Sequence, residues 1–142
     1  MDVWKRLRLL WRRRAVPLHL RHGHIGEQAA RKYLQRLGLK FLTANFRSKR
    51  GEIDLVLRDC DCLVFVEVKT RSSEAWTRPA AAVNARKRKL LSATALDYLR
   101  LTKNPHVRIR FDVVEVLLID SKVREVRHLP NTFALTPPFR YG

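Results

Sequence analysis

Residues 51–70 read GEIDLVLRDCDCLVFVEVKT, which is two apolar stretches joined by a short polar segment. Both stretches are rich in Ile, Val, Leu and Phe, residue types that favour β-strands, so the segment predicts a β-hairpin. If the loop consists of the two residues Cys60 and Asp61, counting back along both strands places Asp54 opposite Glu67. The hairpin therefore predicts two carboxylates that face each other across neighbouring strands.

The second strand of this hairpin is expected to be covered on both faces, because residues 63–68 contain only one charged side chain. Side chains alternate along a strand, so Glu67 and Lys69 are predicted to share one face, and Asp54 joins them across the hairpin. Burying a charged side chain in an apolar setting destabilises the protein unless the charge is paired. Charges in such a setting are therefore candidates for a functional role. We interpret the three as a functional site; the alternative is a set of surface charges on a sheet with one solvated face.

The chemistry of these three residues suits a divalent metal ion. Carboxylates on directly opposed residues repel each other unless positive charge lies between them, since their Cβ atoms are only about 4.5–5.5 Å apart. Mg²⁺ takes carboxylate oxygens and keeps water molecules that can be activated. Lys69 beside it could lower the pKa of the attacking water or stabilise charge on a phosphate. These parts suffice for hydrolysis of a phosphodiester.

The charge balance of the chain indicates a polyanionic partner. There are 30 Lys and Arg residues against 13 Asp and Glu, a formal net charge of +17 that exceeds what solubility requires. Nucleic acid is the favoured partner, because each cation that neutralises a phosphate releases a counterion; a solvated or membrane-directed surface is the alternative. The candidate phosphate contacts are Arg47, Lys49, Arg50, Arg71, Arg86, Lys87, Arg88 and Lys89.

The chain of 142 residues has room for one domain. We expect a basic N-terminal extension over residues 1–22, a folded domain over 23–135 and a short tail over 136–142. The extension is compatible with an amphipathic helix or with an irregular segment. Cys60 and Cys62 are too close in sequence for an ordinary structural disulfide, which favours a reduced, cytoplasmic setting. No apolar run approaches the roughly 20 residues of a membrane-spanning helix.

Hydrophobic periodicity predicts an α/β fold. The order of elements is helix, three strands, helix and two strands, which indicates a mixed sheet flanked by helices. The expected elements are a helix that starts at Gly26 and is ended by Gly38, strands over residues 39–46, 52–58 and 63–70, a helix over residues 79–101, and strands over residues 107–119 and 123–129.

Two further groups of side chains invite a site assignment. Glu27 lies on the inward side of the first helix and is either a third acid of the site or an acid that favours the helix dipole. His19, His22 and His24 are clustered in sequence, but Pro17 and an intervening glycine argue against a helix that would bring the rings together. We therefore expect no metal site at the histidines.

Four spaced motifs together resemble the YraN-like family of small bacterial proteins. The resemblance covers roughly residues 23–133, and that family is in turn similar to archaeal Holliday-junction resolvases and to the PD-(D/E)xK nucleases. The motifs are Gly-Glu-x-x-Ala-x-x-Tyr-Leu at 26–34, Gly-Glu-Ile-Asp-Leu at 51–55, Val-Phe-Val-Glu-Val-Lys-x-Arg at 64–71 and Arg-Phe-Asp-Val-Val at 110–114.

The resemblance implies a restriction-endonuclease-like fold, with a central mixed β-sheet flanked by helices. It implies Asp54 and Glu67 as metal ligands, Lys69 as the catalytic lysine and Glu27 as the acid contributed by the first helix. Ile53 precedes Asp54 where the motif of these nucleases has proline.

Residues and resemblance together predict an endonuclease that depends on Mg²⁺ or Mn²⁺ and hydrolyses DNA, including branched or otherwise structured DNA. The alternative is a non-catalytic nucleic-acid-binding protein or adaptor that retains the fold. A role on RNA is not separated from one on DNA, because phosphate contacts ignore the sugar. A homodimer is expected by analogy with enzymes that cut two strands.

Overall fold

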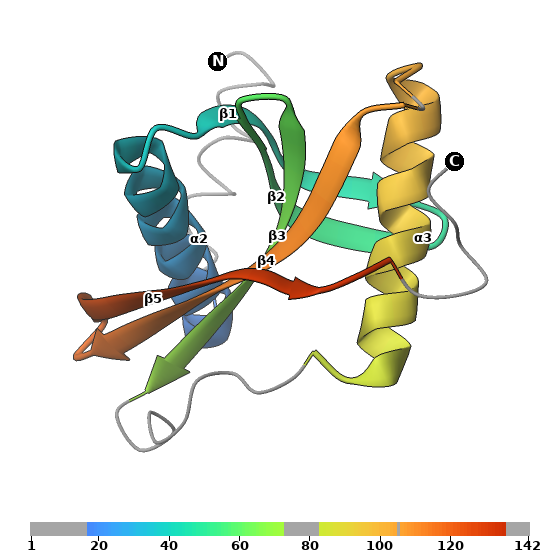
Figure 1. Cartoon of the computed structure of the whole chain (residues 1–142). Helices are drawn as coiled ribbons and strands as arrows, with labels where there is room; N and C mark the ends of the chain where they lie inside the picture. The colour runs from blue at the N-terminus through green and yellow to red at the C-terminus, as the bar shows by residue number, and fades with distance from the viewer. Residues whose placement is uncertain (1–16, 73–82, 105, 136–142) are drawn as a thin grey trace, which may run out of the picture.

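The computed structural model describes residues 17–72, 83–104 and 106–135, which form a five-stranded sheet with one helix on each side (Figure 1). Their order is the predicted one. The expected N-terminal extension up to residue 16 and the tail over 136–142 lie outside the described residues. The elements are α2 (Leu18–Arg36), β1 (Lys40–Ser48), β2 (Gly51–Asp59), β3 (Cys62–Ser72), α3 (Ala85–Leu101), β4 (Arg108–Ile119) and β5 (Lys122–Phe133).

The sheet is mixed, with strand order β1-β2-β3-β4-β5. Neighbouring strands are antiparallel except for β3 and β4, which run parallel. Parallel neighbours need a long crossover connection, and here it contains α3. The predicted mixed α/β architecture is therefore confirmed.

Two apolar cores lie on opposite faces of the sheet, and we call these the α3 face and the α2 face after the helix that covers each. On the α3 face Phe65 packs with Leu91 and Phe111. On the α2 face Val64 and Val66 pack with Leu34. The strand β3 thus buries alternate side chains on both faces, as its nearly continuous apolar run predicts.

The helix α2 begins earlier than predicted, at Leu18 and not at Gly26, and it crosses the expected boundary after residue 22. Our inference that Pro17 and Gly23 keep this segment from being helical was wrong. Pro17 is the N-cap residue, where a missing N–H does no harm, and an interior glycine weakens a helix by only about 1 kcal/mol. The predicted end is confirmed: Gly38 follows the helix with φ +98°.

The helix α3 begins at Ala85, where Asn84 caps it, and the predicted start at Pro79 lies outside the described residues. The Asn84 side chain accepts a hydrogen bond from the Lys87 N–H at 2.9 Å, a favourable N-cap arrangement. The helix ends at Leu101 as expected.

Cys60 and Cys62 are both free thiols at the β2–β3 turn. Within the described residues, the helices are all too short or too polar to cross a membrane.

Candidate functional site

The predicted hairpin register is confirmed. The pairs from Asp59 with Cys62 to Leu55 with Val66 follow from the two-residue loop. Past the last of these pairs the ladder between β2 and β3 ends, and the Val68 N–H instead donates a hydrogen bond to Asp54 Oδ2 at 2.8 Å. The Asp54 side chain thus takes the place of a backbone acceptor where the two strands separate.

The carboxyl groups of Asp54 and Glu67 are in direct contact through a hydrogen bond. Burial raises the pKa of both groups, and the charge of Asp54 raises that of Glu67 further, to about 7. The two side chains therefore lie on the same side of the sheet, as the register requires. Their desolvation thus outweighs the effects of the Val68 N–H and of Lys87, which lower the pKa.

Lys87, at the start of α3, forms an ion pair with Glu67. Its Nζ lies 3.5 Å from Glu67 Oε1, and its charge lowers the pKa of both acids. The sequence placed Lys87 only in the basic patch. The structure brings it into the site, because the Asn84 cap starts α3 beside the strand that carries Glu67. Nothing in the sequence indicated this contact, because Lys87 and Glu67 are far apart in the chain and lie on different elements.

Lys69 follows Glu67 on the α3 face, and its register partner on β4 is Glu115. Glu115 is only 1% exposed, and Arg127 is in turn its partner on β5. Three charged residues thus form a row across neighbouring strands beside the acid pair. Sequence reasoning missed Glu115, although a single acid within an apolar run was the same signal that identified Glu67.

Glu27 approaches the site from α2. Burial raises its pKa, and the charges of Asp54 and Glu52 raise it further, while a hydrogen bond from Asn45 opposes them. The Asn45 amide is oriented so that its nitrogen lies 3.2 Å from Glu27 Oε2 and 3.1 Å from Glu52 Oε1, since the reverse orientation would face its oxygen to acceptors only. Asn45 and Glu52 are members of the site that the sequence did not assign.

Two glycines allow the helices to come close to the sheet beside these acids. A Cβ atom on Gly26 would overlap Thr70 Oγ1 of β3, and one on Gly51 would lie 2.8 Å from Thr94 Oγ1 of α3. The glycines precede Glu27 and Glu52, respectively. The Gly-Glu pairs of the first two motifs therefore combine close packing with placement of an acid.

The donor set suits a hard divalent cation in its chemistry. Mg²⁺ is commonly held by one or two carboxylates together with water and substrate phosphate, and Asp54 and Glu67 supply such a pair. As the side chains of the described residues stand, no three of the acid, histidine or cysteine type are disposed to hold a metal ion. In this arrangement Glu27 borders the acid pair.

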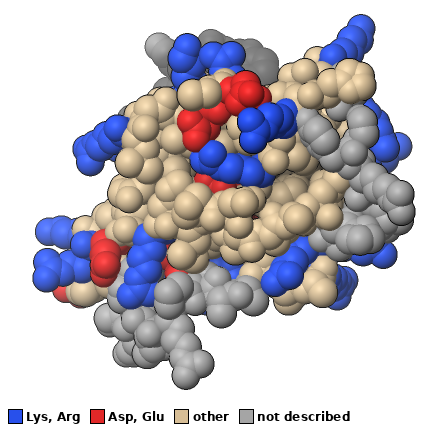
Figure 2. Space-filling model, viewed as in Figure 1, with Lys and Arg blue, Asp and Glu red and all other residues tan. Residues whose placement is uncertain are grey.

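The basic residues are less uniform than predicted. Arg50 makes two hydrogen bonds to Asp97, at 3.0 and 2.6 Å, and Arg47 pairs with Glu52. Figure 2 shows basic side chains scattered over one face, with acidic ones in two places, one near the β2–β3 turn and one toward the β4–β5 end at the left. Several predicted phosphate contacts are thus engaged within the protein, and this face carries no single continuous basic patch.

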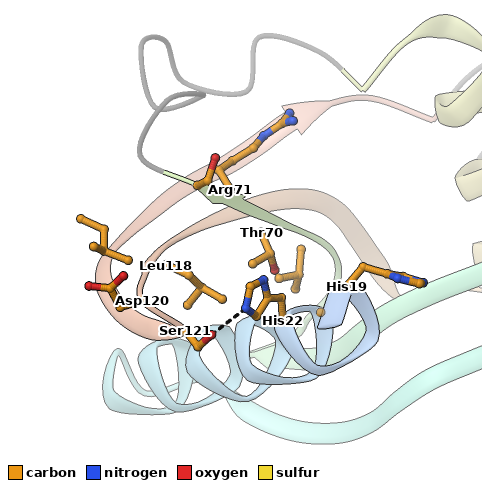
Figure 3. A pocket seen from close by; sticks show the side chains of 11 residues that line it. His19, His22, Thr70, Arg71, Leu118, Asp120 and Ser121 are labelled. Atoms are coloured by element: carbon orange, nitrogen blue, oxygen red, sulfur yellow. Dashed lines mark hydrogen bonds between the residues drawn. The ribbon is translucent and has the colours of Figure 1, made fainter. Parts of the chain in front are cut away.

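A separate pocket of about 570 Å³ lies on the α2 face, between the first turns of α2, the end of β3 and the β4–β5 turn (Figure 3). His22 Nε2 lies 2.9 Å from Ser121 Oγ across it, and the Arg71 side chain extends away from both. Val68 and Thr70 line the pocket, so Glu67 and Lys69, which alternate with them, belong to the opposite face. The pocket is therefore distinct from the acid pair.

The sequence model of the family described as "Uncharacterised protein family UPF0102" matches residues 26–116. The chain belongs to this family, also known as the YraN family. A UPF0102 protein of Trichlorobacter lovleyi is 43% identical over 114 residues, which are 80% of this chain and 90% of that protein. One of Rhodococcus opacus is 36% identical over 111 residues, 78% of this chain and 94% of that protein. The resemblance stated from the motifs is thus confirmed at the level of the family, and the matched region contains Glu27, Asp54, Glu67 and Lys69.

Proposed function

We propose that this UPF0102 protein is a metal-dependent endonuclease of the PD-(D/E)xK type, with a restriction-endonuclease-like fold, that hydrolyses phosphodiester bonds in DNA. One observation carries the proposal. Asp54 and Glu67 are partly buried acids in contact, both with a raised pKa, and Lys69 follows Glu67 on the same strand face. Such a juxtaposition destabilises the protein unless a cation offsets it, so it is typical of a metal site.

Each residue has a distinct part in the proposed reaction. Asp54 and Glu67 would hold Mg²⁺ or Mn²⁺, and the bound ion would supply an acidic water molecule and polarise a phosphate oxygen. The Val68 N–H fixes the orientation of Asp54. Lys69 would stabilise the negative charge that develops on the phosphate. Lys87, which balances Glu67 in the metal-free chain, would become available for a phosphate oxygen.

The net charge of +17 supports nucleic acid as the substrate class. Arg86 and Lys89 are exposed cations in the first turns of α3, as Lys87 is. A backbone that contacts them would pass close to the acid pair. These contacts position a backbone without reading its sequence, which suits a substrate recognised by its branched or otherwise distorted shape.

The test is a cleavage assay on labelled duplex, single-stranded and four-way-junction DNA and on structured RNA, with Mg²⁺, Mn²⁺ or EDTA. Wild-type protein should cleave DNA only with a metal ion. Lys69→Met should lower the rate about 10²–10³-fold, since it removes a group that stabilises developing charge, and Asp54→Asn at least as much. Cleavage that persists in both variants would contradict the site assignment.

Matched controls are Asp61→Asn and Lys122→Met, which remove the same charges from exposed positions at strand turns. Both should cleave at the wild-type rate. Their folding, followed by circular dichroism, separates loss of chemistry from loss of structure.

The second candidate function is a non-catalytic nucleic-acid-binding protein. It is favoured by the Lys87–Glu67 ion pair, which already offsets part of the negative charge without a metal ion. DNA binding without cleavage under every metal condition, unaffected by Asp54→Asn, would support this function over the nuclease.

A further inference from the structure

The strands β1 and β2 turn over at Asp54, which means that side-chain positions facing α2 on one side of this residue face α3 on the other. Ala44 and Leu55 are paired and pack in the core of the α2 face, whereas the pair Phe46 and Ile53 packs in that of the α3 face. Residues two apart in a regular strand share a face, so both strands change face between these pairs. Asp54 occupies the crossing point on β2.

Asn45 occupies the same point on β1 and has a positive φ of 53°. Few residues adopt this conformation readily; glycine, asparagine and aspartate are favoured. The turnover explains how an acid from α2 meets acids that face α3. Without it, Glu27 and Glu67 would be separated by the sheet.

The Asn45 amide nitrogen bridges two carboxylates from different elements, Glu27 of α2 and Glu52 of β2. Glycine at this position would keep the backbone conformation but lose the donor, and aspartate would add a further negative charge. Asparagine satisfies both requirements. Glu52 Oε2 is held in turn by Arg47 Nε at 3.2 Å, so the bridge is anchored on the β2 side.

We propose that Asn45 is a positioning residue that holds Glu27 toward Asp54, so that the third acid can assist metal binding at the Asp54–Glu67 pair. This inference rests on the proposed function, because it assigns a purpose to Glu27 at that site. Groups that orient metal-site residues typically change metal affinity about 10–100-fold when they are removed.

The first experiment is a double-mutant cycle on Mn²⁺ affinity, measured by titration calorimetry without DNA on wild type, Asn45→Gly, Glu27→Ala and the double variant. Asn45→Gly should weaken binding about tenfold in the wild-type background and less than about twofold in the Glu27→Ala background. Asn131→Gly is the matched control, since Asn131 also has a positive φ and uses only its backbone N–H in the contact with Asp112. Equal weakening in both backgrounds, or none in either, would overturn the proposal.

The second experiment repeats the cycle on the urea unfolding midpoint without metal. The shifts in midpoint that the two substitutions cause should not add up in the double variant, because the Asn45–Glu27 hydrogen bond is present in the metal-free chain. Non-additive midpoint shifts without Mn²⁺ binding by wild type would overturn the metal site and the role of Asn45 in it. The Asn45–Glu27 hydrogen bond would still be supported. Mn²⁺ binding without coupling in either cycle would overturn the role of Asn45 alone and leave the proposed function intact.

Discussion

Two groups of acids on the strands of this protein have opposite surroundings. At Asp112 on β4, which is fully buried, the carboxylate accepts hydrogen bonds from His128 Nε2 at 2.8 Å, the Asn131 N–H at 2.9 Å and Arg110 Nε at 3.1 Å. Burial alone would raise the pKa of Asp112, but these donors outweigh it and the pKa is lowered. Asp54, which is partly buried, accepts a hydrogen bond from the Val68 N–H and has a carboxyl group as its neighbour, and its pKa is raised.

The difference separates a structural acid from a candidate functional one. Asp112 has enough donors in the chain itself, and these tie β4 to β5 around an irregularity in their pairing. At Asp54 and Glu67, burial and the neighbouring carboxyl group outweigh the Val68 N–H and the charge of Lys87. A partly buried acid pair whose donors do not offset its desolvation is retained at some loss of stability, which is common at sites of binding and chemistry.

The largest expected effect on stability comes from removing each charge in turn. Asp112→Asn should lower the free energy of unfolding by about 3–5 kcal/mol, because a fully buried carboxylate loses its charge-assisted hydrogen bonds from Arg110, His128 and the Asn131 N–H. Asp54→Asn should raise it by about 1 kcal/mol, since its amide can still accept from Val68 N–H and donate to Glu67. Urea unfolding near neutral pH measures both. The comparison fails if the two changes have the same sign.

A smaller effect is expected from pH. The pKa of Glu67 is raised from 4.5 to about 7, so the folded chain holds this proton more tightly than the unfolded chain, and stability falls as the pH rises through that interval. The full change corresponds to roughly 3 kcal/mol at 1.36 kcal/mol per pKa unit. Metal-free wild type should therefore lose stability relative to Glu67→Gln between about pH 4.5 and pH 8.

Added Mn²⁺ should diminish this loss, because the ion binds the deprotonated acids. By contrast, the contribution of Asp112 should be lost only in acid, below its ordinary pKa, because its pKa is lowered. A wild-type curve parallel to that of Glu67→Gln would show that Glu67 has an ordinary pKa.

The smallest effect concerns how α2 delivers Glu27. Gly26→Ala should lower the free energy of unfolding by about 1–3 kcal/mol, because its methyl group would overlap Thr70 and push the helix away. Gly23→Ala, three residues earlier in the same helix with open space around it, should raise it by about 0.5–1 kcal/mol. Thermal unfolding compares the two. Adding Thr70→Ala should restore part of the loss at Gly26, and no restoration would mean that another contact limits the approach.

The sequence predicted the parts of this fold that depend on local pattern. The hairpin register followed from a two-residue loop and the alternation of side chains, and both hold over short distances in the chain. Helix starts were less predictable. Pro17 and Asn84 act as caps, and whether a residue caps a helix or interrupts it depends on where packing lets the helix begin.

By itself, the sequence determined the order of elements, the family, and the opposition of Asp54 to Glu67, because each is encoded in neighbouring residues. Only the tertiary structure brought Lys87 to Glu67, placed Asn45 between Glu27 and Glu52, and set Glu115 beside Lys69. These residues come from separate helices and strands, and their meeting depends on the turnover of β1 and β2 and on the close approach that the glycines permit. Distance along the chain carries no information about such contacts, since they arise only when two faces of a sheet are packed at once.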